Sequence, residues 1–215
     1  TFGNKKYAYR VLMGDPLGSF YGYRYKGVYQ NVEETYAVDK TGQQIMDING
    51  APVVVKNGDQ KVYPGDAKYE DVNGDGVIDE NDIVYLGNSN PTLTGGLNFT
   101  LRYKKLSLVA ALHGRAGQKV INESRINMEN MYGKNNQSVA VLRRWRSEGD
   151  NTDIPRALYD KGYNYLGSDR FVEDASFLRL KTITLKYQFP ENWMKPLGIN
   201  KLEIYATGYD LFVWT

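Results

Sequence analysis

Two pairs of alternating segments constrain the fold of this chain more than any other feature. In residues 97–103 every second side chain is apolar, and after two lysines residues 106–113 again place Leu or Ala at every second position. Side chains of a β-strand point alternately to the two faces of a sheet, so this pattern predicts two strands joined by a tight hairpin. Residues 182–189 and 201–207 repeat the pattern around the turn-like segment "PENWMKPLGIN". Antiparallel β structure is therefore expected.

Long polar stretches separate these strands, at residues 31–92 and 114–175. The second stretch contains two segments with helical character, "INESRINMENMYG" and "QSVAVLRRWRSEG", and weaker strand candidates lie at 5–14 and 19–31. Connections in compact soluble domains are mostly short, whereas a membrane barrel combines short turns on one side with long loops on the other. A soluble β-sandwich gives the same alternation, so periodicity leaves both the barrel and a soluble β protein open.

Several function classes find no support in the sequence. A net charge of +2 without a clustered basic surface does not favour nucleic-acid binding, and the chain has no cysteine for a disulfide or a thiolate metal site. No run of 18 apolar residues predicts a transmembrane helix. The only histidine, His113, has no Ser or Cys partner in a catalytic pattern, and the neighbours Glu173 and Asp174 point to opposite faces of a strand. We therefore expect that the chain is not an enzyme.

The segment "DVNGDGVIDEND", residues 71–82, has the spacing of a calcium loop. Acidic or amide side chains fall at positions 1, 3, 5, 9 and 12, a glycine falls at the sharp turn of position 6, and position 7 offers a carbonyl. The predicted ligands are Asp71, Asn73, Asp75, Val77, Asp79 and Asp82, with Ile78 packed inward. Asp66 and Glu70, just outside, are expected to be solvated. The alternative is an Asx-rich surface turn without metal, and any bound calcium is expected to be a structural clip.

Several segments together resemble one family. They are "GDPLGSFYGYRYKGVYQN", "YPGDAKYEDVNGDGVIDENDIVYLGNSNPTLTGGLNFTLRYKKLSL", "VLRRWRSEGDNTDIPR", "RFVEDASFLRLKTITLKYQFP" and "GYDLFVWT", in that order. They are similar to the C-terminal barrel portion of the SusC/RagA family of TonB-dependent outer-membrane transporters of Bacteroidota. The chain departs from the family at Asp210, where Asn is usual, and at Lys105, where the tight turn commonly has Gly. The missing initiator Met and the end within an apolar run suggest a fragment.

The resemblance implies an all-β fold, part of a large transmembrane antiparallel barrel of about 22 strands with a plug and long extracellular loops. Residues 1–215 would be a fragment of that barrel, and residues 65–92 an extracellular segment bearing the calcium loop. It implies import of glycan or peptide oligomers across the outer membrane, energised by TonB through a segment outside this chain. A SusD-like surface lipoprotein would be the partner, and outer-membrane lipid would surround the wall.

The same resemblance gives expected places for several aromatic residues, and no residue is assigned to the substrate. Tyr21, Tyr23, Tyr25 and Tyr29 are expected in an aromatic girdle, Trp193 in a periplasmic turn, and Trp145 in a loop that contacts substrate or the lipoprotein. The alternative function is a soluble calcium-stabilised β adhesin or carbohydrate-binding module. The exposure of the apolar strand faces distinguishes the two, because a soluble protein buries them in a core.

Overall fold

The computed structural model describes residues 12–159 and 162–215 and divides the chain into two compact units. We call residues 90–119 together with 174–215 the sheet unit, and the remainder, up to residue 89 and from 120 to 173, the loop unit. The strand candidate at 5–14 falls mostly outside the described residues. Among those described, every helix is too short or too polar to cross a lipid bilayer.

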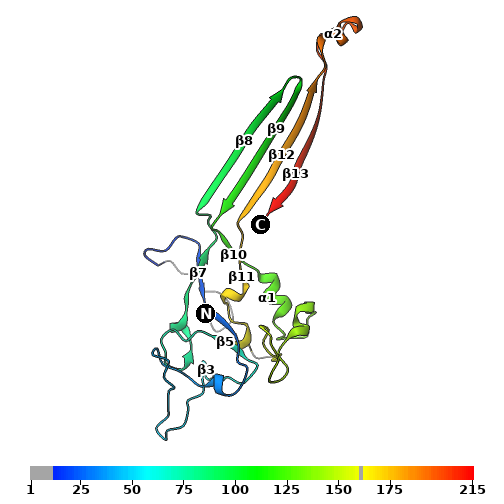
Figure 1. Cartoon of the computed structure of the whole chain (residues 1–215). Coiled ribbons are helices and arrows are strands. Elements are labelled where there is room, and N and C mark those ends of the chain that lie inside the picture. The colour runs from blue at the N-terminus through cyan, green and yellow to red at the C-terminus, as the bar shows by residue number, and fades with distance from the viewer. Residues whose placement is uncertain (1–11, 160–161) are drawn as a thin grey trace. The chain divides into compact units, whose positions relative to one another are not determined.

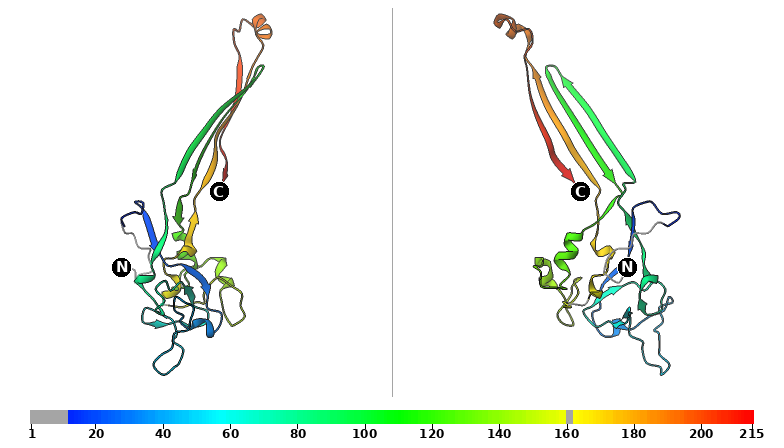
Figure 2. Two further views of the ribbon diagram at one scale, coloured as in Figure 1. Left: turned by 60° about the vertical axis from the view of Figure 1, so that its left-hand side comes forward. Right: turned by 180° about the vertical axis from the view of Figure 1, so that it is seen from behind.

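Four long strands form the sheet unit in the antiparallel order β13-β12-β9-β8 (Figure 1). Their bounds are Leu93–Tyr103 for β8, Leu106–Ala116 for β9, Phe177–Gln188 for β12 and Glu203–Trp214 for β13. Both predicted strand pairs are confirmed. Tyr103 pairs with Leu106 across the two lysines, and "PENWMKPLGIN" carries α2 (Glu191–Met194) and the 3-10 turn η7 (Lys195–Leu197). Figure 2 shows the sheet as a single layer.

The two faces of this sheet differ in chemistry, as the alternation predicts. Leu97, Leu101 and Ile204 lie on the apolar face, and their side chains are 61%, 60% and 55% exposed. The opposite face is polar, and on it the hydroxyl oxygens of Thr184 and Thr207 lie 3.0 Å apart on neighbouring strands. The sheet unit therefore presents a wide apolar surface that its own residues leave uncovered.

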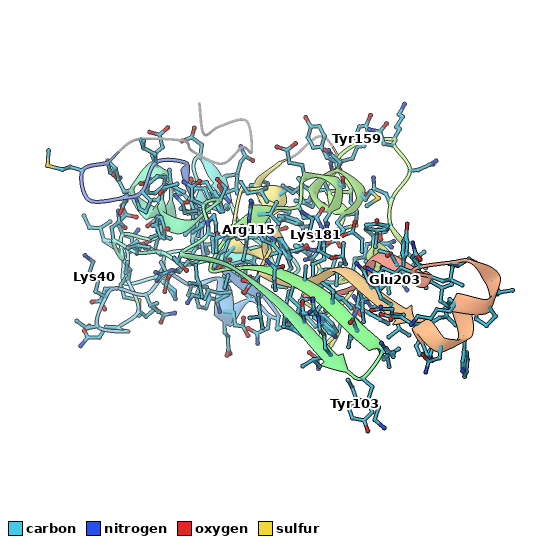
Figure 3. The ribbon with its side chains drawn as sticks, turned by 90° about the horizontal axis from the view of Figure 1, so that it is seen from above. Lys40, Tyr103, Arg115, Tyr159, Lys181 and Glu203 are labelled. Carbon is cyan, nitrogen blue, oxygen red and sulfur yellow. The ribbon has the colours of Figure 1, made fainter. Side chains whose placement is uncertain are left out.

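A β-bulge in β12 keeps the apolar face continuous. Leu178 and Leu180 occupy even positions, whereas Ile183 and Leu185 occupy odd ones. The register of β12 shifts against both neighbouring strands just after Leu180, so the extra residue Lys181 (labelled in Figure 3) reverses the alternation. All four apolar side chains thereby reach one face, whereas strict alternation would turn the first two onto the polar face.

Asp210 marks a matching irregularity in β13. Its φ of 47° lies in the left-handed region, which Asn and Asp tolerate better than other residues with a Cβ. The ladder with β12 is irregular at this point, because Tyr209 pairs with Thr182 and Phe212 with Leu180. Asn and Asp both suit this conformation, so the departure from the family's usual Asn is sterically conservative.

Short strand pairs joined by irregular chain form the loop unit. The antiparallel pairs are β1 (Ser19–Gly22) with β7 (Val84–Asn88) and β2 (Tyr25–Val28) with β5 (Ala67–Tyr69), and a small sheet has the order β4 (Gln60–Lys61), β3 (Lys56–Asn57), β6 (Val77–Ile78). The strand candidate at 19–31 is thus confirmed as β1 and β2. The pair β10 (Lys119–Ile121) and β11 (Val172–Asp174) contains two of the boundaries between the units.

Helical structure in the loop unit is limited. The first predicted helical segment forms α1 (Glu123–Glu129), and Asn122 caps it by accepting a hydrogen bond from the backbone N–H of Arg125. The second forms only a 3-10 turn, because the chain becomes extended at Arg144. The 3-10 turns are η2 (Glu33–Thr35), η3 (Glu80–Asp82), η4 (Val139–Arg143), η5 (Tyr163–Tyr165) and η6 (Asp169–Phe171).

Tyrosines build much of the core of the loop unit, and the girdle expected for Tyr21, Tyr23, Tyr25 and Tyr29 is wrong. Tyr21, Tyr23 and Tyr29 are buried and Tyr25 is partly buried; three of the four pack in one cluster with Tyr69 and Ile78. The hydroxyl of Tyr25 donates to the carbonyl of Asp153 at 2.6 Å, and burial raises its pKa, which keeps this donor protonated. Alternation placed these rings on one side of a strand but did not reveal what covers them.

The hairpin turn of the sheet unit yields a stability prediction. Lys104, at the first turn position, has a φ of 52°, whereas Lys105 has a negative φ. Tyr103, next to the turn, projects at the hairpin tip in Figure 3. A left-handed conformation costs a residue with a Cβ about 1 kcal/mol, which glycine avoids. Lys104→Gly should therefore raise the free energy of unfolding of the full chain by about 1 kcal/mol, measured by urea titration in detergent.

The neighbouring lysine is the control for this change. Lys105→Gly adds backbone freedom without relieving strain, so it should lower stability by about 0.5–1 kcal/mol. Equal effects of the two substitutions would contradict a strained Lys104.

Candidate functional site

The acidic loop, residues 71–82, lies in the loop unit between β5 and β7. Gly74 and Gly76 adopt left-handed φ angles of 70° and 80°, which bend the chain where the calcium-loop pattern requires a sharp turn. The following strand β6 pairs in parallel with β3. Ile78 is 3% exposed and belongs to the main core cluster, so its predicted inward packing is confirmed.

The first and last residues of the loop close it through backbone hydrogen bonds. One carboxylate oxygen of Asp71 accepts from the N–H of Gly74 at 2.6 Å, and the other accepts from that of Gly76 at 2.7 Å. Asp82 is fully buried and accepts from the N–H groups of Val72 at 2.8 Å and Asp79 at 2.9 Å. Burial raises the pKa of Asp82, and the nearby charge of Asp71 raises it further. Two carboxylates are thus held close together at the base of the loop.

The intermediate residues form local turns of their own. Asn73 Oδ1 accepts from the N–H of Asp75 at 3.1 Å, Asp75 Oδ1 from that of Val77 at 2.8 Å, and Asp79 Oδ1 from that of Asn81 at 2.7 Å. Within the described residues no group of three or more Asp, Glu, His or Cys side chains gathers around one point. The four predicted carboxylate ligands therefore share one closed loop without converging, and calcium binding stays a prediction.

An ionic centre forms around Asp66 in the same unit. Arg156 forms a bidentate pair with the carboxylate of Asp66: Nε donates to Oδ1 at 2.7 Å and Nη2 donates to Oδ2 at 3.2 Å. Asn164 donates to Oδ1 of Asp66 at 3.3 Å and accepts from the N–H of Ala67 at 2.8 Å. The N–H of Tyr63 supplies a further bond to Asp66, at 2.8 Å. Burial alone would lower the pKa of Arg156, but the hydrogen bond and charge of Asp66 raise it.

Trp145 completes this centre from another segment. A Cβ placed on Gly65 would collide with its indole ring, and Gly65 has a φ of 88° that suits glycine alone. The N–H of Trp145 donates to the carbonyl of Ile154 at 2.9 Å, and the N–H of Arg156 donates to that of Gly65 at 2.7 Å. The motifs "PGD", "RRW" and "IPR", distant in sequence, therefore meet at one place.

The expected solvation of Asp66 is wrong, because its side chain is 0% exposed. Glu70 is the partly exposed neighbour, and it pairs with Arg24 at 3.1 Å and Lys26 at 3.0 Å. Sequence analysis missed the Asp66–Arg156 pair because the two residues lie 90 positions apart. Both residues belong to motifs that resemble the family, "PGD" and "IPR". A motif does not show, however, which distant residue its members contact.

A second buried ionic group lies on α1. Glu129 accepts from Arg125 Nε at 2.9 Å and from Arg170 Nη2 at 3.0 Å. The guanidinium of Arg170 also stacks over the rings of Tyr25 and Phe171, with its carbon 5.3 Å and 5.0 Å from their centroids. Cation–π contacts of this kind stabilise a buried guanidinium. The group ties the helix to the tyrosine core.

Known proteins that this chain resembles are named as TonB-dependent receptors or importers of the same kind. The chain is 34% identical over 209 residues to TonB-dependent receptor P26 of Formosa agariphila, and 30% identical over 205 residues to TonB-dependent receptor P3 of that organism. It is 27% identical over 173 residues to TonB-dependent receptor SusC of Bacteroides thetaiotaomicron. The chain is a SusC/RagA-like TonB-dependent receptor sequence. The resemblance found in its motifs is confirmed.

The matches cover nearly all of this chain but a small part of each receptor. They span 96% and 94% of the chain, and only 19% and 18% of P26 and P3. The fold matches the RagAB peptide importer in its closed-closed state with a TM-score of 0.62 at 22% identity, over 96% of this chain and 21% of that one. No family model matches. These relatives are receptors and transporters rather than enzymes, consistent with the expectation from the sequence.

The ionic centre yields a prediction about stability. Arg156→Ala leaves the fully buried Asp66 carboxylate without its cation, and breaking a buried pair in this way costs about 3–5 kcal/mol. The matched change Arg24→Ala removes a more exposed arginine from Glu70 and should cost less than about 1 kcal/mol. Denaturant titration of the two variants of the full chain measures the difference. Similar small losses in both would show that the Asp66 pair does not hold the loop unit together.

Proposed function

We propose that this chain forms part of the wall and outer loops of an outer-membrane importer that takes up oligomeric nutrients, glycans or peptides, with energy from TonB. The relatives support this reading, since they are named TonB-dependent receptors, SusC and the RagAB peptide importer. By the same reasoning, the partner is a SusD-like surface lipoprotein and the location is the outer membrane. The sheet would continue into a closed barrel through strands that pair with β8 and β13.

The exposed apolar face of the sheet unit is the observation that carries the proposal. Its four strands have 11 or 12 residues each, and about 9–11 residues are enough for a tilted strand to cross a bilayer. Lipid would cover the face that carries Leu101 and Ile204, and the polar face would line the lumen. A soluble adhesin or carbohydrate-binding module needs such side chains inside a core, so their exposure favours the importer.

Neighbouring residues on β8 provide the test. Phe99→Arg puts a charge at the centre of β8 on the proposed lipid face, which costs about 2–4 kcal/mol near the bilayer midplane, whereas Thr100→Arg points to the polar face. In the full-length receptor expressed in its host, Phe99→Arg should sharply reduce the protein recovered from detergent-extracted outer membranes with its surface lipoprotein. Thr100→Arg should leave recovery near that of the unaltered receptor.

A different distribution would contradict the importer. Recovery of the unaltered receptor in the soluble fraction, or equal tolerance of the two arginines, would mean that the apolar face does not meet lipid.

We also propose that the acidic loop binds calcium as a structural clip. The spacing of its oxygen-bearing residues, the left-handed turns at Gly74 and Gly76, and the close approach of the Asp71 and Asp82 charges support a cation there. An ionised carboxylate has about four acceptor positions, so the backbone bonds leave capacity for a metal. Asn73, Asp75 and Asp79 would turn toward the ion, which would supply only charge neutralisation and rigidity.

Calcium titration of matched variants tests the clip. Asp75→Asn removes one charge from the loop, where this carboxylate accepts from the N–H of Val77 and the side-chain amide of Asn73. Asp47→Asn removes one charge from an unrelated turn, where the carboxylate accepts two backbone N–H bonds, both at 2.8 Å. Saturating calcium should raise the stability of the unaltered chain by about 2–3 kcal/mol at a hundredfold excess over Kd. Asp75→Asn should weaken binding about tenfold or more, and Asp47→Asn should not. Absence of any calcium effect on the unfolding midpoint, or equal loss in both variants, would contradict the clip.

A further inference from the structure

A recess of about 340 Å³ opens in the loop unit beside the acidic loop. Four segments line it. They are the β3–β4 hairpin with Asn57 and Gln60, the start of η3 with Asp79 and Glu80, the turn that carries Tyr163 and Leu166, and Tyr23 between β1 and β2. Its volume lies at the small end of ligand pockets, which suits a ligand of about one ring. None of the metal or importer arguments above uses this recess.

The polar side of the recess offers hydrogen-bonding groups that the protein leaves free. The side chains of Gln60 and Glu80 are exposed and make no hydrogen bond or ion pair within the described part of the chain. Asn57 donates to the carbonyl of Tyr163 at 3.4 Å, so its own amide oxygen stays available. Asp79 accepts two bonds from Asn81, and its remaining acceptor positions are those proposed above for calcium. The set left to a ligand is therefore two amides and one carboxylate, which together donate and accept.

Leu166 and Tyr163 supply an apolar part of the lining. Leu166 belongs to the main core cluster, and the N–H of its backbone donates to the hydroxyl of Tyr69 at 3.1 Å. Tyr163 lies next to the ionic centre. Burial raises the pKa of its hydroxyl, and the nearby charge of Asp66 raises that pKa further. The aromatic side chain is thus held in place by the same pair that organises the loop unit.

We propose that this recess binds one pyranose ring of a neutral carbohydrate. A pyranose has a rim of hydroxyls and a C–H face, which match the free amides and carboxylate and the apolar residues Tyr163 and Leu166 of the same lining. A cationic ligand is the competing occupant, because Asp79 and Glu80 both line the recess. The role of the recess as a cargo subsite rests on the proposed import function, whereas the binding itself does not.

Binding to the purified full chain in a detergent without a sugar headgroup tests the proposal. The probes are the methyl β-pyranosides of glucose, galactose and mannose, with Nα-acetyl-lysine amide as the cationic comparison, followed by saturation-transfer NMR and titration. Gln60→Ala and Glu80→Ala should each weaken glycoside binding about threefold to tenfold, the effect of one lost hydrogen bond. Asp59→Ala is the matched control, because Asp59 lies in the same hairpin turn but does not line the recess.

Three results would overturn the proposal: no saturation transfer to any of the glycosides, an equal loss with Asp59→Ala, or tighter binding of the lysine amide that Gln60→Glu strengthens further. Failure of the import function is recognised separately, by recovery of the receptor outside the membrane. If the chain binds glycosides in this way but never reaches the outer membrane, the recess is a carbohydrate site and its role as a cargo subsite is wrong.

Discussion

The bidentate pair between Asp66 and Arg156 is the interaction on which the loop unit depends. Short strands and irregular chain cannot by themselves position segments that are 90 residues apart, because ordering each residue costs conformational entropy. Burying the Asp66 carboxylate without partners would cost a large desolvation free energy. The folded arrangement that supplies its partners is therefore strongly favoured over any that does not. Arg156, Asn164 and the N–H of Tyr63 meet that requirement together. Trp145, through Gly65, and Tyr163 of the recess lie next to this pair.

The two units differ in net charge and in how they bury their apolar side chains. The loop unit hides its tyrosines and aliphatic side chains in clusters of its own, and its residues carry a net charge of −4. The sheet unit has ten Lys and Arg against four Asp and Glu, a net charge of +6, and leaves leucines on its apolar face exposed. Such a face is stable only where something other than water covers it, because uncovered apolar surface of this extent is unfavourable in water. This contrast is the physical basis for reading the sheet as a membrane wall and the loop unit as a water-exposed module.

The acidic loop and the recess share residues and a common support. Ile78 joins the loop to the core, and Asp79 both caps η3 and faces the recess. Any change in the loop's conformation would therefore move part of the recess wall. A cation in the loop would stiffen that wall without touching a ligand, which links the two proposals structurally while leaving their tests independent.

The sequence by itself determined the four long strands, the two-lysine hairpin, the turned acidic loop and the family, because alternation, Asx–Gly spacing and motif order are local properties of the chain. Only the tertiary structure decided that Asp66 is buried against Arg156, that Lys181 reverses the alternation of β12, and that the tyrosines at 21, 23 and 29 are buried. Periodicity tells which side chains share a face, but it does not tell what lies against that face. Contacts between distant segments depend on the tertiary fold of the whole chain. A buried group stays charged only if that fold brings a partner next to it.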